Sequence, residues 1–252
     1  TGVVTATLAT DTLANLNGLT GTGNAYTLVI NDAGTVAATD LSALDGKTTV
    51  AINATSAATV SGTGTALATA LGSAGINTAA GVALSVSNSI ASTQLATLDG
   101  LTTGIITATI SDNDLASLAS LTNANANNAL TITVTDSSAD ATALNAVDSQ
   151  SSVSLTATAV NTVTGTAAAA VTGLAASGTT LNLAADVDVT IDSGTATTAQ
   201  QAALDADTTG TITATITEND LATLAGLADS NGNNALTVTV TDASVAAAAL
   251  NT

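Results

Sequence analysis

The chain has 252 residues, of which 46% are hydrophobic, 19 are acidic and one is basic, and its formal net charge is −18. This charge argues against binding to nucleic acid or to anionic lipid surfaces, because both need cationic side chains. The sequence contains no Cys or His, which excludes a disulfide framework and catalysis by these residues. No apolar run reaches the roughly 18 residues that a membrane span needs, so we expect no membrane insertion.

The sequence repeats itself at a fixed offset. Residues 103–145 return as residues 209–251 without a gap. A marker, Leu or Val followed by Asp, recurs at 44–45, 98–99, 147–148 and 204–205. The markers predict one continuous repeat array over 1–252, with half-repeats at about 1–45, 46–99, 100–148, 149–205 and 206–252. Because the chain begins and ends inside a repeat, we interpret it as a fragment of a longer chain.

Strand and helix patterns alternate along the chain. Runs in which apolar residues alternate with Thr or Ser indicate strands with one buried face, and they begin near residues 3, 27, 50, 82, 105, 130, 153, 187, 211 and 236. Most steps are 23 to 25 residues, but those from 50 to 82 and from 153 to 187 are longer. A strand and a helix in so few residues leave no room for hairpins, so successive strands should stack in parallel.

The last half-repeat shows the pattern most clearly. After the alternating run at 211–216, leucines at a spacing of three indicate one side of a short helix over 219–227, namely Leu221, Leu224 and Leu227. In the next predicted strand the inward side chains are Leu236, Val238 and Val240. An Ala-rich helix is expected at 244–250.

These patterns predict a repeat solenoid in which parallel β-strands stack coil on coil, each followed by a short helix. The apolar residues are almost all Ala, Val, Leu and Ile, which fill a narrow core layer better than a thick one. The alternative is a string of all-β sandwich domains of about 100 residues each. The lack of Trp and Phe and the recurring helical patterns favour the solenoid.

No residue is assigned a catalytic, cofactor-binding or metal-binding role, and we expect the protein not to be an enzyme. Without His, Cys or Arg, acid–base chemistry would depend on carboxylates alone. Asp192-Ser193-Gly194 matches half of the aspartic-protease signature but has no second copy, so we interpret it as a turn leaving a strand. Lys47 lies in a marker loop and is interpreted as a solvated residue.

Calcium is the one cofactor that the acidic residues suggest. Asp186, Asp188 and Asp192 lie on one face of a predicted strand, and Ca²⁺ prefers oxygen ligands. The Gly and Glu of an EF-hand loop and the glycine-rich nonapeptide of calcium-binding β-rolls are absent from the sequence. An exposed acidic face is therefore the simpler interpretation, and no cofactor is required.

Helix capping accounts for the acidic pairs of the repeated block, Asp112 with Asp114 and Glu218 with Asp220. Acidic side chains are favourable at helix N-termini, where they accept hydrogen bonds from free amides. The segments Ser111–Asp114 and Thr217–Asp220 also fit the capping box.

Outward threonines of the predicted strands could form ranks on a flat sheet, as in ice-binding solenoids. The candidates are Thr107, Thr109, Thr131, Thr133, Thr135, Thr211, Thr213, Thr215, Thr237, Thr239 and Thr241. Ser85 and Ser87, and Asp186 and Asp188, interrupt the pattern. Thr is also a favourable residue on any exposed strand face.

Three runs resemble a known class of sequence: ALDGKTTVAINAT, LDADTTGTITATITENDLATLAGL and ALTVTVTDASVAAAALN. They are similar to the Ala/Thr-rich tandem repeats of very large surface proteins of marine cyanobacteria, and bacterial S-layer proteins have a similar composition. The resemblance covers nearly the whole chain. It implies an extracellular or cell-surface structural protein that is part of a surface layer, filament or adhesin. We expect self-association, head to tail or lateral; the alternative is a calcium-dependent or ice-binding adhesive module.

Overall fold

The computed structural model describes residues 2–123 and 127–244. The chain divides into two compact units, one of Thr1–Asp112, Ser120–Thr131 and Gln150–Ser152, and the other of Asn113–Ala119, Ile132–Ser149 and Val153–Thr252. In each unit, parallel strands in sheets alternate with helices. The parallel direction agrees with the sequence analysis. It also rules out the alternative of all-β sandwich domains, whose sheets are antiparallel.

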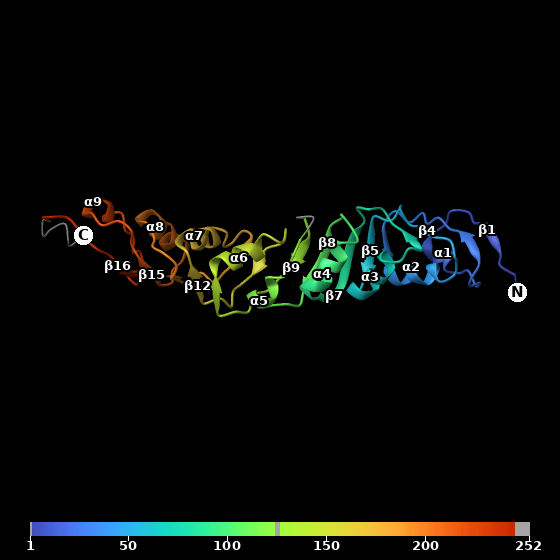
Figure 1. Ribbon diagram of the computed structural model, residues 1–252, viewed down its shortest axis with the longest axis horizontal. Helices are drawn as coiled ribbons and strands as arrows, with labels where there is room; N and C mark the ends of the chain where they lie inside the picture. The colour runs from blue at the N-terminus through green and yellow to red at the C-terminus, as the bar shows by residue number, and fades with distance from the viewer. Residues whose placement is uncertain (1, 124–126, 245–252) are drawn as a thin grey trace. The chain divides into compact units, whose positions relative to one another are not determined.

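The first unit contains a five-stranded parallel sheet and two smaller sheets. Its strands are β1 (Thr5–Thr7), β2 (Ala25–Thr27), β3 (Thr35–Ala37), β4 (Ile52–Asn53), β5 (Thr59–Gly62), β6 (Ile76–Asn77), β7 (Ala83–Ile90), β8 (Ile106–Ile110) and β9 (Ala129–Thr131), and its helices are α1 (Leu13–Leu16), α2 (Ala38–Asp45), α3 (Gly64–Leu71) and α4 (Ser92–Asp99). The larger sheet has the order β3-β5-β7-β8-β9, and the pairs β1-β2 and β4-β6 form the others. Helices α2, α3 and α4 follow one another beside these strands (Figure 1).

The second unit has the same plan. Its strands are β10 (Ser138–Asp140), β11 (Leu155–Thr156), β12 (Thr162–Gly165), β13 (Leu181–Asn182), β14 (Asp188–Ile191), β15 (Ile212–Thr215) and β16 (Ala235–Thr237), and its helices are α5 (Leu115–Leu118), α6 (Ala141–Asp148), α7 (Ala167–Ala175), α8 (Thr198–Asp207) and α9 (Leu221–Leu224). The larger sheet has the order β10-β12-β14-β15-β16, and β11 pairs with β13. The strands of the larger sheet stand in chain order, and β11 and β13 lie in the connections between its first three strands.

The core of each unit is built from apolar ranks. In the first unit Val36, Val60, Leu84 and Ile106 pair in register and are buried; in the second, Ala139, Val163, Val189 and Ile212 do the same. Residues on either side of a rank point outward, because side chains alternate along a strand. Leucines of the helices, such as Leu41 and Leu67, cover the ranks and are fully buried.

The spacing of the strands corrects one prediction. We define one coil as the stretch of chain between two residues that are paired in neighbouring strands. The paired residues are 20 positions apart at Thr5–Ala25, 24 at Thr35–Thr59 and 26 at Thr162–Asp188. The two long steps of the sequence analysis run from a strand of a small sheet to a strand of the larger sheet, from β4 to β7 and from β11 to β14, so each spans more than one coil. Helix α3 or α7 lies within the step. The strands that the alternation did not reveal are two to four residues long, too short to show a period of two: β3, β5, β6, β10, β12 and β13.

The last half-repeat departs from its prediction. Val238 and Val240 are 39% and 40% exposed, although we expected them to point inward. Their counterparts Ile132 and Val134 are fully buried, since the strand around residue 156 pairs alongside them, whereas no later strand among the described residues covers Val238 and Val240. The helix expected at 244–250 falls on residues 245–250, which lie outside the described residues.

Candidate functional site

The repeated markers lie where helices end, and each has a second polar residue three positions on. Helices α2, α4 and α6 end at the marker Asp, and α8 ends two residues after it. The hydroxyl residue follows at the same spacing in all four loops, giving the pairs Asp45 with Thr48, Asp99 with Thr102, Asp148 with Ser151, and Asp205 with Thr208. The marker is therefore a four-residue Asp-x-x-Thr/Ser motif.

The marker carboxylates bond to the coil that follows. Asp99 Oδ1 accepts from Asn128 Nδ2 at 3.0 Å, and Asp205 Oδ1 accepts from Asn234 Nδ2 at 2.8 Å. Asp45 accepts from the hydroxyl of Ser73 at 2.9 Å. At the fourth marker, Asp148 accepts from the hydroxyl of Thr180 at 2.8 Å. Each partner is 28 to 32 residues later in the chain, so each bond joins successive coils.

The hydroxyl of the motif bonds to the coil that precedes. Thr102 Oγ1 donates to Val82 O and Thr208 Oγ1 donates to Val187 O, both at 2.6 Å. Thr48 and Ser151 donate in the same way to Tyr26 O and Leu130 O, each at 2.8 Å. Thr48, Thr102 and Thr208 are buried. The hydroxyl thus donates to a backbone carbonyl of the preceding coil, as a backbone amide would within a strand, at a position before the next strand begins.

Asparagine completes the arrangement. Asn128 is fully buried; its Oδ1 accepts from Ile106 N at 2.8 Å while its Nδ2 donates to Asp99. Asn234 makes the same pair of bonds, with Ile212 N at 2.9 Å and with Asp205. A buried amide without a partner would be unfavourable by about 1–3 kcal/mol. The sequence analysis missed these asparagines, although Asn-Asn-Ala-Leu stands unchanged in both copies of the repeat.

The environment of Asp205 favours its charged form. Burial raises the pKa of this carboxyl, but hydrogen bonds from the amide and hydroxyl of Ser230 and from Asn234 outweigh burial and leave the pKa below the ordinary value of 3.8. A charged acceptor makes a stronger hydrogen bond than a neutral one. The hydrogen bonds of Asp205 to the following coil are therefore strongest when this carboxyl is ionised.

A second set of carboxylates links the coils at helix N-termini. Five acidic residues accept from the first amide of a helix that begins 19 to 21 residues earlier, at 2.6 to 3.0 Å: Asp32 to Leu13, Asp112 to Ser92, Asp136 to Leu115, Glu218 to Thr198, and Asp242 to Leu221. The prediction that Asp112 and Glu218 cap helices is confirmed, and the helix in each case belongs to the preceding coil.

The capping boxes that we predicted are wrong. The N-cap residues of α5 and α9 are Asp114 and Asp220, which accept from Ser117 N and Thr223 N. Asp is itself a favourable N-cap, so Ser111 and Thr217 lie outside the helices. The hydroxyls of Ser117 and Thr223 also donate to Asp114 and Asp220, each at 2.7 Å. These hydroxyl bonds, and after them the bonds from the backbone amides, lower the pKa values of Asp114 and Asp220. A true capping box occurs in α8, between Thr197 and Gln200.

The other candidate residues do not converge. Asp186, Asp188 and Asp192 are exposed, and nowhere in residues 2–123 and 127–244 do three or more acidic residues come together as metal ligands. Gly194 has a φ of +89°, so Asp192-Ser193-Gly194 forms a turn after β14, as interpreted from the sequence. Lys47 Nζ donates to Leu19 O at 2.5 Å, which makes it less solvated than we expected.

The outward threonines are exposed as predicted, apart from the half-buried Thr211. The longest rank in register is Thr164, Thr190 and Thr213, on β12, β14 and β15. Asp140 precedes this rank and Ala235 follows it. The same row of the first unit reads Ala37, Ser61, Ser85, Thr107 and Ala129. Threonine ranks are therefore short in both units.

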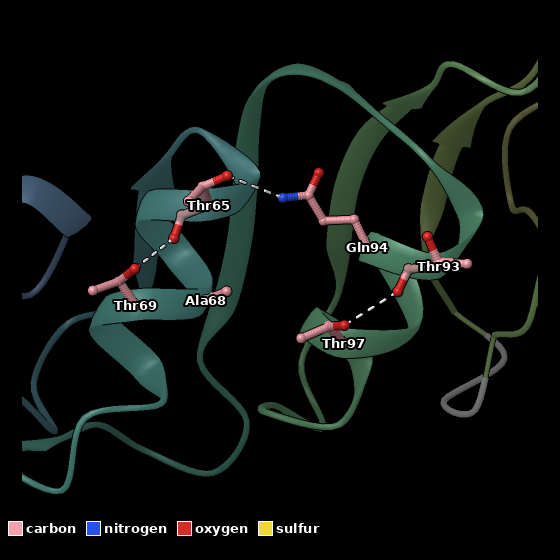
Figure 2. A pocket seen from close by; sticks show the side chains of 6 residues that line it. All are labelled: Thr65, Ala68, Thr69, Thr93, Gln94 and Thr97. Atoms are coloured by element: carbon pink, nitrogen blue, oxygen red, sulfur yellow. Dashed lines mark hydrogen bonds between the residues drawn. The ribbon is translucent and has the colours of Figure 1, made fainter.

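A shallow hollow of about 560 Å³ lies between α3 and α4 (Figure 2). Its lining residues are Thr65, Ala68, Thr69, Thr93, Gln94 and Thr97. Gln94 reaches across to Thr65 Oγ1 at 3.4 Å, and the hydroxyls of Thr69 and Thr97 donate to carbonyls of their own helices. None of these side chains is an acid or a base, so the hollow lacks the groups that acid–base catalysis uses.

Comparison with protein-family models, with curated proteins and with solved structures finds no match. Across the described part of the chain, every helix is too short or too polar to cross a membrane. The repeated inter-coil hydrogen bonds are thus the feature from which function must be argued.

Proposed function

We propose that the protein is an extracellular structural repeat protein, part of a surface layer, a filament or an adhesin at the cell surface. In this proposal the chain is one continuous solenoid array rather than an enzyme. The observation on which it rests is that the polar residues of the repeat bond to neighbouring coils. Asp99, for example, binds the next coil, and Thr102 binds the previous one.

Cohesion between coils is what a structural repeat protein requires. Each coil of a solenoid contacts only its neighbours, so stability is approximately a sum of the interfaces between them. A ladder of parallel strands, an apolar rank and the polar links of the markers and caps would resist separation along the array. The negative charge also fits the proposal, since a net charge of −18 keeps individual chains soluble while salt outside the cell screens it.

Self-association is the partner interaction that follows, through strand edges joined head to tail or through lateral contacts. Sedimentation velocity and negative-stain electron microscopy over a range of protein and NaCl concentrations test it. We expect filaments or sheets to form as salt increases, because screening weakens the repulsion between acidic chains. A chain that remains monomeric at every salt and protein concentration would contradict self-assembly.

The alternative is an adhesive module that binds ice or calcium, and the rank Thr164–Thr190–Thr213 is the observation in favour of ice. Thermal hysteresis at high protein concentration tests ice binding, with Thr190→Asp as the variant that interrupts the rank. For calcium, melting with and without a chelator at constant ionic strength is decisive. A lower melting temperature in chelator supports specific sites, whereas an effect of NaCl alone supports charge screening.

A further inference from the structure

Asn53 is the one asparagine of the 252-residue sequence that is followed two positions later by Ser or Thr, in Asn53-Ala54-Thr55. This pattern, with any residue except Pro in the middle, marks the acceptor of N-linked sugars. Such a short motif occurs often by chance, so the local structure must show whether the side chain is accessible and suitably arranged.

The three residues form a turn that presents the asparagine. Thr55 Oγ1 donates to Asn53 Oδ1 at 2.7 Å, and Thr55 N donates to the same oxygen at 3.1 Å. Asn53 and Thr55 are exposed, while Ala54 between them is fully buried. The buried alanine therefore anchors the turn and holds both polar side chains on the outside.

Both hydrogen bonds end on the carbonyl oxygen of the Asn53 amide. Both polarise the carbonyl, which withdraws electrons from Nδ2 and makes its protons easier to lose. Among the described residues, no group accepts a hydrogen bond from Asn53 Nδ2. By contrast, Asn128 and Asn234 use both ends of their amides inside the fold.

We propose that Asn53 is an acceptor site for an N-linked sugar. The donor is a diphosphate-activated sugar, delivered by a glycosyltransferase. A bond forms between Nδ2 and the anomeric carbon, the bond from that carbon to the phosphate oxygen breaks, Nδ2 loses a proton, and the diphosphate leaves. This assignment rests on the extracellular role proposed above, because N-linked sugars are typical of surface and secreted proteins.

The second unit supplies a matched position. Thr156 is the last residue of β11 as Asn53 is the last residue of β4, and Ala157, like Ala54, is fully buried after it. The same turn hydrogen bond closes both segments, Ala57 N to Ala54 O at 3.2 Å and Val160 N to Ala157 O at 3.1 Å. Thr156→Asn therefore installs the acceptor pattern in an equivalent turn.

The test uses the folded chain, a purified glycosyltransferase specific for Asn-x-Ser/Thr and UDP-glucose, with intact-mass and fragment-ion spectra as the readout. A parallel reaction with a lipid-diphosphate sugar and its own transferase shows which donor is accepted. We expect one sugar, on Asn53. It should be lost in Asn53→Gln and in Thr55→Val, retained in Thr55→Ser, and joined by a second sugar in Thr156→Asn. Circular dichroism confirms that each variant is folded.

An unmodified wild-type chain would overturn the proposal, and a synthetic peptide of residues 48–60 shows why. If the peptide is modified, the fold blocks the site; if it is not, the sequence itself is not accepted. Modification of Thr55→Val at the wild-type level would also overturn the role of the hydroxyl. The readout is the mass of single chains, so its failure is distinct from a failure of self-assembly.

Discussion

Asn128→Ala removes the most buried polar link of the first unit. The wild-type side chain is 0% exposed and bonds to Ile106 N at 2.8 Å and to the Asp99 carboxylate at 3.0 Å. Its loss leaves the Ile106 amide buried without an acceptor, which is unfavourable by about 1–3 kcal/mol, and removes a hydrogen bond to a charged group worth about 1.5–3 kcal/mol. Because the two effects overlap, we expect a loss of about 3 kcal/mol.

Asn24→Ala is the matched control, since Asn24 has the same place in the first repeat. Its Oδ1 accepts from Val4 N at 3.0 Å, but Val4 is exposed and Asn24 is half-buried, so water can replace the bond. We expect a loss below about 1 kcal/mol there. Urea unfolding gives both values, and exchange of the Ile106 amide should accelerate about a hundredfold in Asn128→Ala. Equal losses in the two variants would refute the reasoning.

Three further predictions concern the other links. Asp112→Ala removes the inter-coil cap of α4 and should destabilise the chain by about 1 kcal/mol in thermal unfolding, whereas no change would exclude a capping role. Gly104→Ala places a Cβ against the carbonyls of Gly81 and Val82 and should cost about 1–3 kcal/mol, while Gly100→Ala, which meets only ordinary contacts, should be neutral in the same melting assay. The pKa of Asp205 is lowered in the folded chain, so its contribution to stability is complete above the unfolded pKa near 3.8 and is lost as the pH falls through the folded pKa. The Asp205→Asn variant should therefore unfold more easily at neutral pH, and its stability should depend less on pH below about 4. Parallel curves of stability against pH for the two proteins would count against the link.

The direction and faces of most strands could be predicted from the sequence. Alternation in segments such as 106–110 places Ile106, Ala108 and Ile110 inside and the threonines outside, and the structure agrees. The short coil length left parallel stacking as the remaining choice. By contrast, β6 and β13 contain two residues each, and no periodicity can be seen in so short a run.

The role of the marker could not be predicted, although its position could. Asp99 and Thr102 look like loop residues, because their partners Asn128 and Val82 lie 29 and 20 residues away in opposite directions. Such pairings depend on the register between coils, which a single half-repeat does not contain. Comparison of the two copies could have indicated Asn128 and Asn234, since a polar residue retained between Ala- and Thr-rich neighbours requires a partner.

The most direct test of the account is a double-mutant cycle on Asp99 and Asn128, because it measures the link between successive coils itself. Asp99→Ala, Asn128→Ala and the double variant are compared by urea unfolding, with the unlinked pair Asp45 and Asn128 as the control. We predict a coupling free energy of about 1–2 kcal/mol for the linked pair and additivity for the control. Additive effects within about 0.3–0.5 kcal/mol for Asp99 and Asn128 would contradict the claim that the markers hold the coils together.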